Sequence, residues 1–211
     1  MSARTTVHLL RHGEVDNPEG ILYGRLPGYH LSERGRQMAE LAAKHLAHRD
    51  VSVLVSSPLE RARETSQPLV EALGVPLRLD DRLIEAANTF EGRPFTASRL
   101  REPAIWPRLL NPLKPSWGEP YAQIAARMSA VVAAARDAAR GHEAVLVSHQ
   151  LPIETARRAL AGERLWHDPR HRQCRLASVT SFEYVGDALV AITYAEPARA
   201  LLDDADPGAG A

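Results

Sequence analysis

Residues 7–13 read Val-His-Leu-Leu-Arg-His-Gly, an apolar run that leads directly into Arg11, His12 and Gly13. The run predicts a strand buried on both faces, as is typical of parallel sheets covered by helices. Arg11 and His12 would then lie at the carboxyl end of that strand, where open α/β sheets bind ligands. Arginine offers a fork of donors that matches phosphate oxygens, and histidine can act as a nucleophile. Taken alone, the tripeptide is more typical of a basic strand end in which His12 only caps or packs.

The composition is that of an ordinary globular protein. The chain has 211 residues, and both Lys+Arg and Asp+Glu number 26. With equal numbers of basic and acidic residues, the protein has no net positive charge to attract nucleic acid or an anionic membrane, so we expect neither partner. Any basic site must therefore be local. The single cysteine, Cys174, rules out an intrachain disulfide and suits a reducing cytoplasm. No apolar stretch approaches membrane-spanning length, so we expect neither export nor a membrane anchor.

Strand-like runs alternate with helical patterns along the chain, which predicts an α/β fold. We expect a three-layer α/β/α sandwich whose mostly parallel central sheet has an antiparallel edge. The predicted strands are Thr5–Leu10, Val51–Ser56, a short one within Leu77–Ile84, Ala144–Ser148, and a hairpin of Val179–Tyr184 and Ala188–Tyr194. The predicted helices run from a Ser32 cap to Leu46, from a Ser57-Pro58 cap to Leu73 with Pro68 as a potential kink, from Tyr121 to Arg140, and from Pro152 to Leu160.

The sequence predicts one domain over residues 1–196. Within it, residues 86–120 carry six prolines and little periodicity, which favours a lid-like insertion. Its Trp106 and Trp117, with several arginines, either line a substrate mouth or pack the insertion. Residues 197–211 are predicted to form a flexible C-terminal tail. The edge hairpin is a candidate surface for a homodimer, and the sequence leaves the oligomeric state open.

Three predicted strand ends carry reactive side chains: Arg11-His12, Ser56-Ser57 followed by Arg61, and Ser148-His149. Parallel strands place such ends at one edge of the sheet, where a phosphate would meet both arginines and His149. Arg61 also lies in the first turn of its predicted helix, where a cation opposes the macrodipole unless an anion is near. The alternative is an ordinary ion pair between Arg61 and Glu64.

Motifs along residues 5–160 carry a resemblance to a known family. In order they are Leu10–Glu14 with Asn17, Leu31–Gln37, Ser56–Ala62 with Thr65, Leu83-Ile84-Glu85 followed by Phe90-Glu91-Gly92, and Val147-Ser148-His149. This series resembles the histidine phosphatase superfamily, in its phosphoglycerate mutase-like branch. The resemblance implies a cofactor-independent and metal-independent enzyme that acts on a small phosphomonoester.

The resemblance also implies roles for individual residues. His12 would attack phosphorus and form a phosphohistidine, while Arg11, Arg61 and His149 would hold the phosphoryl oxygens. Asn17 is a weaker candidate for the same binding shell. Glu85 would act as general acid and then general base, which requires a raised pKa. The competing carboxylates are those of Glu14, Asp81 and Glu91, and the pairs His45/His48 and His167/His171 are interpreted as surface or packing residues rather than metal ligands.

Two departures from the family pattern bear on the activity. Dedicated mutases carry a Glu-Arg-His-Tyr-Gly-type segment after the acid, whereas this chain has Ala86-Ala87-Asn88-Thr89-Phe90. The departure favours a phosphatase of small phosphorylated metabolites over a mutase. A non-catalytic phosphate-binding or protein-binding module is the third alternative. The second departure is Gln150, directly after His149, where many relatives have glycine. The sequence leaves the physiological substrate open.

Overall fold

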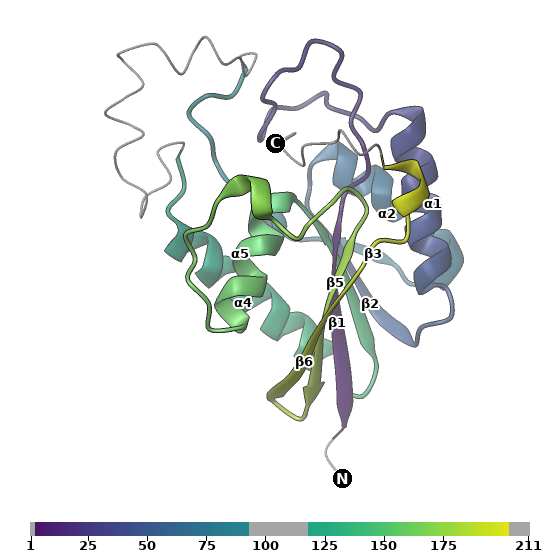
Figure 1. Ribbon diagram of the computed structural model, residues 1–211. Coiled ribbons are helices and arrows are strands. Elements are labelled where there is room, and N and C mark those ends of the chain that lie inside the picture. Colours follow the sequence, from purple (N-terminus) through teal and green to yellow (C-terminus); the bar gives the residue numbers. More distant parts are fainter. Residues whose placement is uncertain (1–2, 93–117, 203–211) are drawn as a thin grey trace.

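The computed structural model describes residues 3–92 and 118–202. Its strands form one six-stranded sheet in the order β3-β2-β4-β1-β5-β6 (Figure 1). β1, β2, β3 and β4 pair in parallel, while β5 runs antiparallel to β1 and to β6. The strands are β1 (Arg4–Arg11), β2 (Val51–Ser56), β3 (Leu77–Leu79), β4 (Glu143–Ser148), β5 (Val179–Val185) and β6 (Ala188–Ala195). The predicted α/β class, the parallel core and the antiparallel edge are confirmed.

Helices cover both faces of the sheet. One face packs against α1 (Glu33–Leu46) and α2 (Glu60–Leu73), and the other against α4 (Tyr121–Ala138) and α5 (Gln150–Leu160), as Figure 1 shows. Short 3₁₀ turns lie at η1 (Asp81–Leu83), η3 (Pro169–His171) and η4 (Arg199–Leu201).

The central strands are apolar on both sides because each face has its own hydrophobic core. In β1, Val7 and Leu9 pack with the α4/α5 side, and Leu10 packs with the α1/α2 side. All three side chains are fully buried. Because both faces of β1 are buried, its sequence is continuously apolar rather than alternating between apolar and polar residues.

The helix starts differ in part from the prediction. Ser32 caps α1 as expected, and its Oγ accepts a hydrogen bond from the Gly35 amide. By contrast, α2 begins at Glu60 without a side-chain cap, and it continues through Pro68 unbroken. The predicted Ser57 cap is therefore wrong. The hydroxyl of Ser57 instead lies 2.8 Å from the ring of His149.

Two glycines hold the loop after β1 against the start of α1. A Cβ at Gly13 would lie 2.4 Å from the carbonyl oxygen of Gly35, and one at Gly35 would lie 2.0 Å from that of Glu14. Real Cβ atoms do not approach backbone so closely. The residue after His12 and the first turn of α1 are thus in direct backbone contact, which fixes the path of the chain beside His12.

The structured region extends past the predicted domain end. Ala198 is buried in the α1/α2 core and Arg199–Leu201 form a turn, so residues 197–202 are not the flexible tail expected from residue 197. Of the predicted lid-like insertion, residues 93–117, with Trp106, Trp117 and the nearby arginines, lie outside the described residues. Within the described ranges, no helix is long and apolar enough to cross a membrane.

Candidate active site

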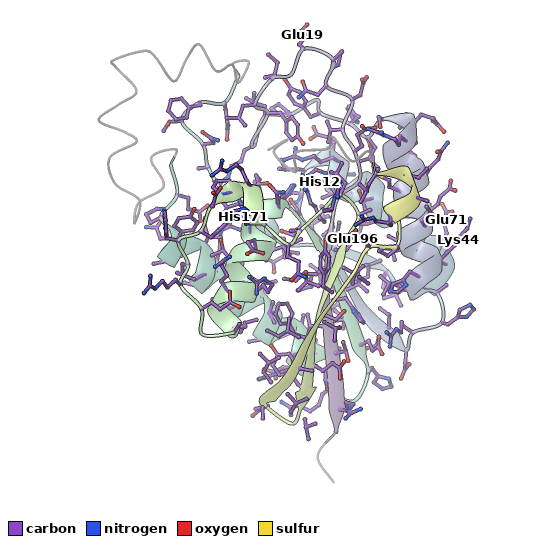
Figure 2. All side chains as sticks on the ribbon, in the orientation of Figure 1. His12, Glu19, Lys44, Glu71, His171 and Glu196 are labelled. Atoms are coloured by element: carbon purple, nitrogen blue, oxygen red, sulfur yellow. The ribbon has the colours of Figure 1, made fainter. Side chains whose placement is uncertain are left out.

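The carboxyl ends of β1, β2 and β4 meet at one edge of the sheet. Arg11 pairs in register with Ser148, and Ser56 pairs with Val147. Beyond these pairs, the His12 amide donates to the Ser148 carbonyl at 3.1 Å. Figure 2 shows His12 at the end of the sheet remote from the N-terminus. The parallel register therefore brings the ends of all three strands together.

His12 is held in one tautomer by its own backbone. Its Nδ1 lies 2.7 Å from the carbonyl oxygen of Gly13, and because a carbonyl only accepts, Nδ1 carries the proton. Nε2 is then the basic nitrogen, and it is buried without a hydrogen-bond partner. Burial, followed by the charges of Arg61 and Arg11, holds the pKa of His12 well below its usual range. The ring is therefore neutral near pH 7, with an available lone pair on Nε2.

His149 is also fully buried, and Ser57 determines its orientation. The Ser57 hydroxyl lies 2.8 Å from Nε2 of His149 and accepts from the Leu59 amide at 3.4 Å. A serine hydroxyl can donate or accept, and in the tautomer in which Ser57 donates to Nε2, a neutral imidazole carries its proton on Nδ1. Burial and the nearby Arg61 lower the pKa of His149 well below its usual range. Nδ1 of His149 is buried without a hydrogen-bond partner.

Two fully buried arginines complete the cationic side of the site. Arg11 donates to the Cys174 carbonyl at 2.8 Å, and its Nε has no partner. Arg61 donates to the Gly24 carbonyl at 2.6 Å and stacks over the ring of Tyr23, 4.7 Å from the centroid. Its Nε and Nη1 have no hydrogen-bond partner. Glu64 instead bonds the Leu31 amide and His30, so the alternative Arg61–Glu64 ion pair is not formed.

Glu85 is the buried carboxyl of the site. It is 3% exposed, its Oε1 accepts from the Ala86 amide at 2.7 Å, and its Oε2 has no partner. Burial raises the pKa of Glu85 above its usual value, although Arg61 and Arg11 act in the opposite direction. A carboxyl so placed can hold a proton closer to neutrality than an exposed one.

The competing carboxylates are engaged elsewhere or exposed. Glu14 forms an ion pair with Arg34 and accepts from the Ser32 hydroxyl. Glu91 accepts from the amides of Arg25 and Asn88, and Asp81 is exposed. These contacts favour Glu85 over the three alternatives as the carboxyl of the site.

Asn17, the weaker phosphate-binding candidate, lies in the loop after β1. Its side-chain amide donates to the Ile21 carbonyl at 2.8 Å, and its oxygen accepts from the Ile21 amide at 3.0 Å. Asn17 therefore holds the turn that leads to Tyr23 and Gly24, and through Gly24 it supports the position of Arg61.

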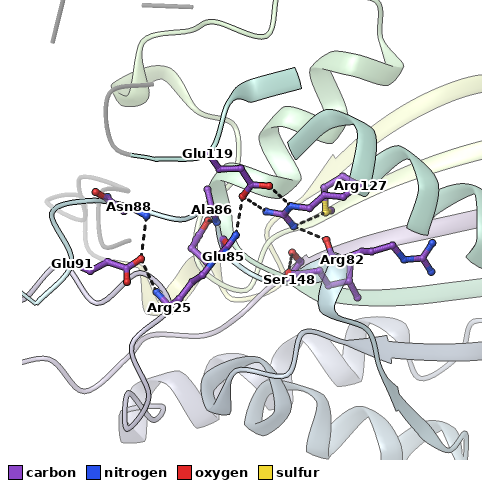
Figure 3. Close-up of polar contacts among 11 residues, drawn as sticks. Arg25, Arg82, Glu85, Ala86, Asn88, Glu91, Glu119, Arg127 and Ser148 are labelled. Atoms are coloured by element: carbon purple, nitrogen blue, oxygen red, sulfur yellow. Dashed lines mark hydrogen bonds and ion pairs between the residues drawn. The ribbon is translucent and has the colours of Figure 1, made fainter. Parts of the chain in front are cut away.

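A partly buried ion network fixes the segment that carries Glu85 (Figure 3). Arg25 donates to the Glu85 carbonyl at 2.7 Å and to Glu119 at 2.8 Å. Arg127, on α4, donates to Glu119 at 2.8 Å and to the Arg82 carbonyl at 2.5 Å. Because Glu119 joins both arginines, the backbone carbonyls of Arg82 and Glu85 are tied to the loop after β1 and to α4. None of these three residues stood out in the sequence, since no local spacing links them.

Unpaired polar atoms concentrate in this site. Among the described residues, nine buried side-chain nitrogen or oxygen atoms lack a hydrogen-bond partner, and six of them belong to His12, His149, Arg11, Arg61 and Glu85. Buried polar groups are normally paired, so such a cluster indicates a polar ligand. Four of these residues offer donors or a basic nitrogen, and arginine forks suit the oxygens of an anion such as phosphate. Within the described ranges, no group of three or more His, Cys, Asp or Glu is placed to hold a metal ion.

The fold and the site together define an α/β protein with a histidine-centred, anion-attracting site at the carboxyl edge of its sheet. Residues 7–196 match the histidine phosphatase superfamily, branch 1, and the chain belongs to that superfamily. The predicted family is therefore confirmed.

Individual relatives include an uncharacterized protein, a protein named as a probable mutase and one named as a phosphatase. An uncharacterized protein of Mycobacterium tuberculosis, Rv0525, is 53% identical over 200 residues, covering 94% of this chain and 99% of its own. A probable phosphoglycerate mutase, GpmB of Escherichia fergusonii, is 29% identical over 184 residues, covering 84% of each chain. The structure of mycobacterial glucosyl-3-phosphoglycerate phosphatase Rv2419c is similar with a TM-score of 0.72 and 26% identity, covering 90% of this chain and 97% of that one.

Proposed function

We propose that the protein is a phosphomonoesterase that hydrolyses small phosphorylated metabolites through a phosphohistidine on His12. The observation that carries the proposal is the buried, unpartnered Nε2 of His12, close to two arginines that each have nitrogens without a hydrogen-bond partner. A neutral imidazole with its other nitrogen bonded to a carbonyl is the form that can attack phosphorus. The similarity to the mycobacterial phosphatase Rv2419c supports the same reaction class.

In the first step, Nε2 of His12 forms a bond to phosphorus as the bond to the ester oxygen breaks. Arg11, Arg61 and Nδ1–H of His149 donate to the non-bridging oxygens, where negative charge is concentrated in the transition state. Glu85, protonated at the start, gives its proton to the departing alkoxide. The pKa of Glu85 is raised by burial, which favours the protonated starting form.

In the second step, water attacks the phosphohistidine. Glu85, now a carboxylate, takes a proton from the water, the P–N bond breaks, and inorganic phosphate leaves with His12 neutral again. Each step uses groups of this chain and water alone, so the proposal includes neither a metal nor a cofactor.

The second candidate is phosphoryl transfer of the mutase type, favoured by the similarity to GpmB. The stretch from Ala86 to Phe90 contains no basic residue and so lacks the mutase-type pattern. We therefore place hydrolysis first.

Phosphate release from p-nitrophenyl phosphate in the presence of a chelator tests the proposal. We expect turnover, together with an acid-labile, alkali-stable phosphoryl label trapped by rapid quenching and mapped to the peptide that contains His12. A label on another residue, or no turnover on any phosphomonoester, would overturn it. Interconversion of phosphoglycerates that requires added bisphosphoglycerate and exceeds phosphate release would favour the mutase instead.

A further inference from the structure

A third arginine, Arg172, lies beside the site and belongs to no sequence motif. It follows the η3 turn and is partly buried. Its Nε donates to Nε2 of His167 at 3.0 Å, and its Nη1 donates to Oε1 of Gln150 at 3.1 Å. Both partners are buried side chains, at 6% and 2% exposed. The guanidinium is therefore oriented by two fixed acceptors rather than left free in solvent.

The partners of Arg172 are neutral. Nδ1 of His167 lies 2.8 Å from the Leu165 carbonyl, so Nδ1 carries a proton. Nε2 can therefore accept the bond from Arg172 only when the His167 ring is neutral. Burial lowers the pKa of His167, consistent with the neutral form. Among the residues that the structure describes, no carboxylate lies within ion-pair distance of Arg172. Two of its five donors are used, so at least two others remain for an anion even if the nearby Tyr121 accepts one.

Arg172 is linked to Arg11 by hydrogen bonds that run through Gln150 and the Cys174 carbonyl. The Gln150 amide nitrogen donates to the Cys174 carbonyl at 3.3 Å, and Arg11 donates to that same carbonyl at 2.8 Å. Arg172 is also close enough to Glu85 and Arg11 for each to influence its pKa, which burial lowers overall. The charge of Arg172 is thus placed next to the phosphate-binding side chains but is fixed by separate partners.

We propose that Arg172 determines substrate specificity by binding a second anionic group, a carboxylate or a second phosphate, on the alcohol half of the phosphomonoester. The proposal rests on the proposed function and deepens it. Arg11 and Arg61 serve the phosphoryl group, whereas a partly buried cation with neutral partners gains most from an anion that the substrate brings. Gln150, which departs from the family's glycine, supplies the acceptor that aligns Arg172. The expected substrates are therefore acidic metabolites with two negatively charged groups a few bonds apart.

Matched substrate pairs test the proposal. The first pair is 3-phosphoglycerate and glycerol 3-phosphate, which differ by a carboxylate, and the second is fructose 1,6-bisphosphate and fructose 6-phosphate, which differ by a phosphate. The readout is the ratio of kcat/KM within each pair. We expect the wild type to prefer the doubly acidic member of at least one pair, and Arg172→Gln to reduce that preference by roughly 10- to 100-fold, as expected for a lost charged hydrogen bond. The pair that shows the effect identifies the second anion as carboxylate or phosphate.

Arg170→Gln is the matched control, because Arg170 lies in the same segment but is exposed and paired with Asp168. It should leave both ratios as in the wild type, and Arg172→Lys should retain part of the preference. Equal losses on both members of each pair would show a merely structural role for Arg172 and would overturn the proposal, as would a wild type without preference. Because p-nitrophenyl phosphate carries no second anion, its hydrolysis by the wild type tests the proposed function separately.

Discussion

The rings of His12 and His149 lie 5.2 Å apart between centroids, with 57° between their planes. They follow neighbouring parallel strands, so the sheet itself sets this separation. In each ring one nitrogen forms a hydrogen bond with a protein partner, which is the Gly13 carbonyl for His12 and the Ser57 hydroxyl for His149. The other nitrogen of each ring is unpaired. The unpaired nitrogen of His12 is a base because the Gly13 carbonyl holds the proton on the other nitrogen, and we propose that the unpaired nitrogen of His149 acts as a donor.

His12→Ala should abolish phosphate release, since it removes the proposed nucleophile. The expected loss in kcat is at least about 10³-fold, the scale seen when a nucleophile is removed. Phosphate release under single-turnover and steady-state conditions measures it, with the exposed His45→Ala as control. Turnover of the His12 variant near the wild-type rate would contradict the covalent mechanism.

Arg61→Lys should weaken the transition state although it keeps the positive charge. Lysine cannot donate both to the Gly24 carbonyl and, in a planar fork, to the bound phosphoryl group. We expect kcat/KM to fall by roughly 10- to 100-fold, the cost of about one or two charged hydrogen bonds. The exposed Arg63→Lys on the same helix is the control. Similar kinetics for the two variants would assign Arg61 a purely structural role.

Glu85→Gln should affect substrates according to their leaving groups. Alkyl phosphates need a proton on the departing oxygen, whereas p-nitrophenolate leaves without one. We expect a rate loss on alkyl phosphates of about 10²- to 10⁴-fold, the usual range for general acid catalysis, and a smaller one on p-nitrophenyl phosphate. The measurement is the rate of phosphohistidine formation in a rapid-quench experiment. Equal slowing of both substrates would place the acid elsewhere.

Glu85→Gln should also stabilise the protein, increasingly so as the pH rises. The pKa of Glu85 is raised above 4.5 in the folded state, so above pH 4.5 the folded state binds more protons than the unfolded state. Stability is therefore lost as the pH rises through the folded pKa, and glutamine removes this loss while keeping the acceptor for the Ala86 amide. Thermal melts between pH 5 and 8 measure it, at about 2–4 °C per kcal/mol, with the exposed Glu19→Gln as control. A difference that shrinks with rising pH would contradict the raised pKa.

Gly35→Ala should destabilise the fold and displace the loop that carries His12. The added Cβ would lie 2.0 Å from the Glu14 carbonyl oxygen, so backbone must move at a cost of about 1–3 kcal/mol. Alanine is otherwise the better helix former, and Gln37→Ala on the exposed face of the same helix should be neutral or slightly stabilising. Denaturant unfolding of both variants measures the difference. Stability of Gly35→Ala equal to that of Gln37→Ala would contradict the close contact.

Much of the architecture could be predicted because it depends on local patterns. β2 runs over the predicted Val51–Ser56, and the Ser32 cap starts α1, since apolar runs and capping residues act within a few positions of themselves. The start of α2 could not be predicted this way. Ser57 looks like a cap in sequence, but its hydroxyl is used by His149, 92 positions away.

The sequence by itself determined the order of strands and helices, and it indicated that Arg11, Arg61 and His149 would lie near His12, because parallel strands carry their ends to one edge. Only the tertiary structure decided which atoms are available there. The Gly13 carbonyl selects the tautomer of His12, burial separates Glu85 from the other carboxylates, and Gln150 with His167 orients Arg172. These effects depend on desolvation and on contacts between residues distant in sequence, and neither leaves a periodic pattern in the chain.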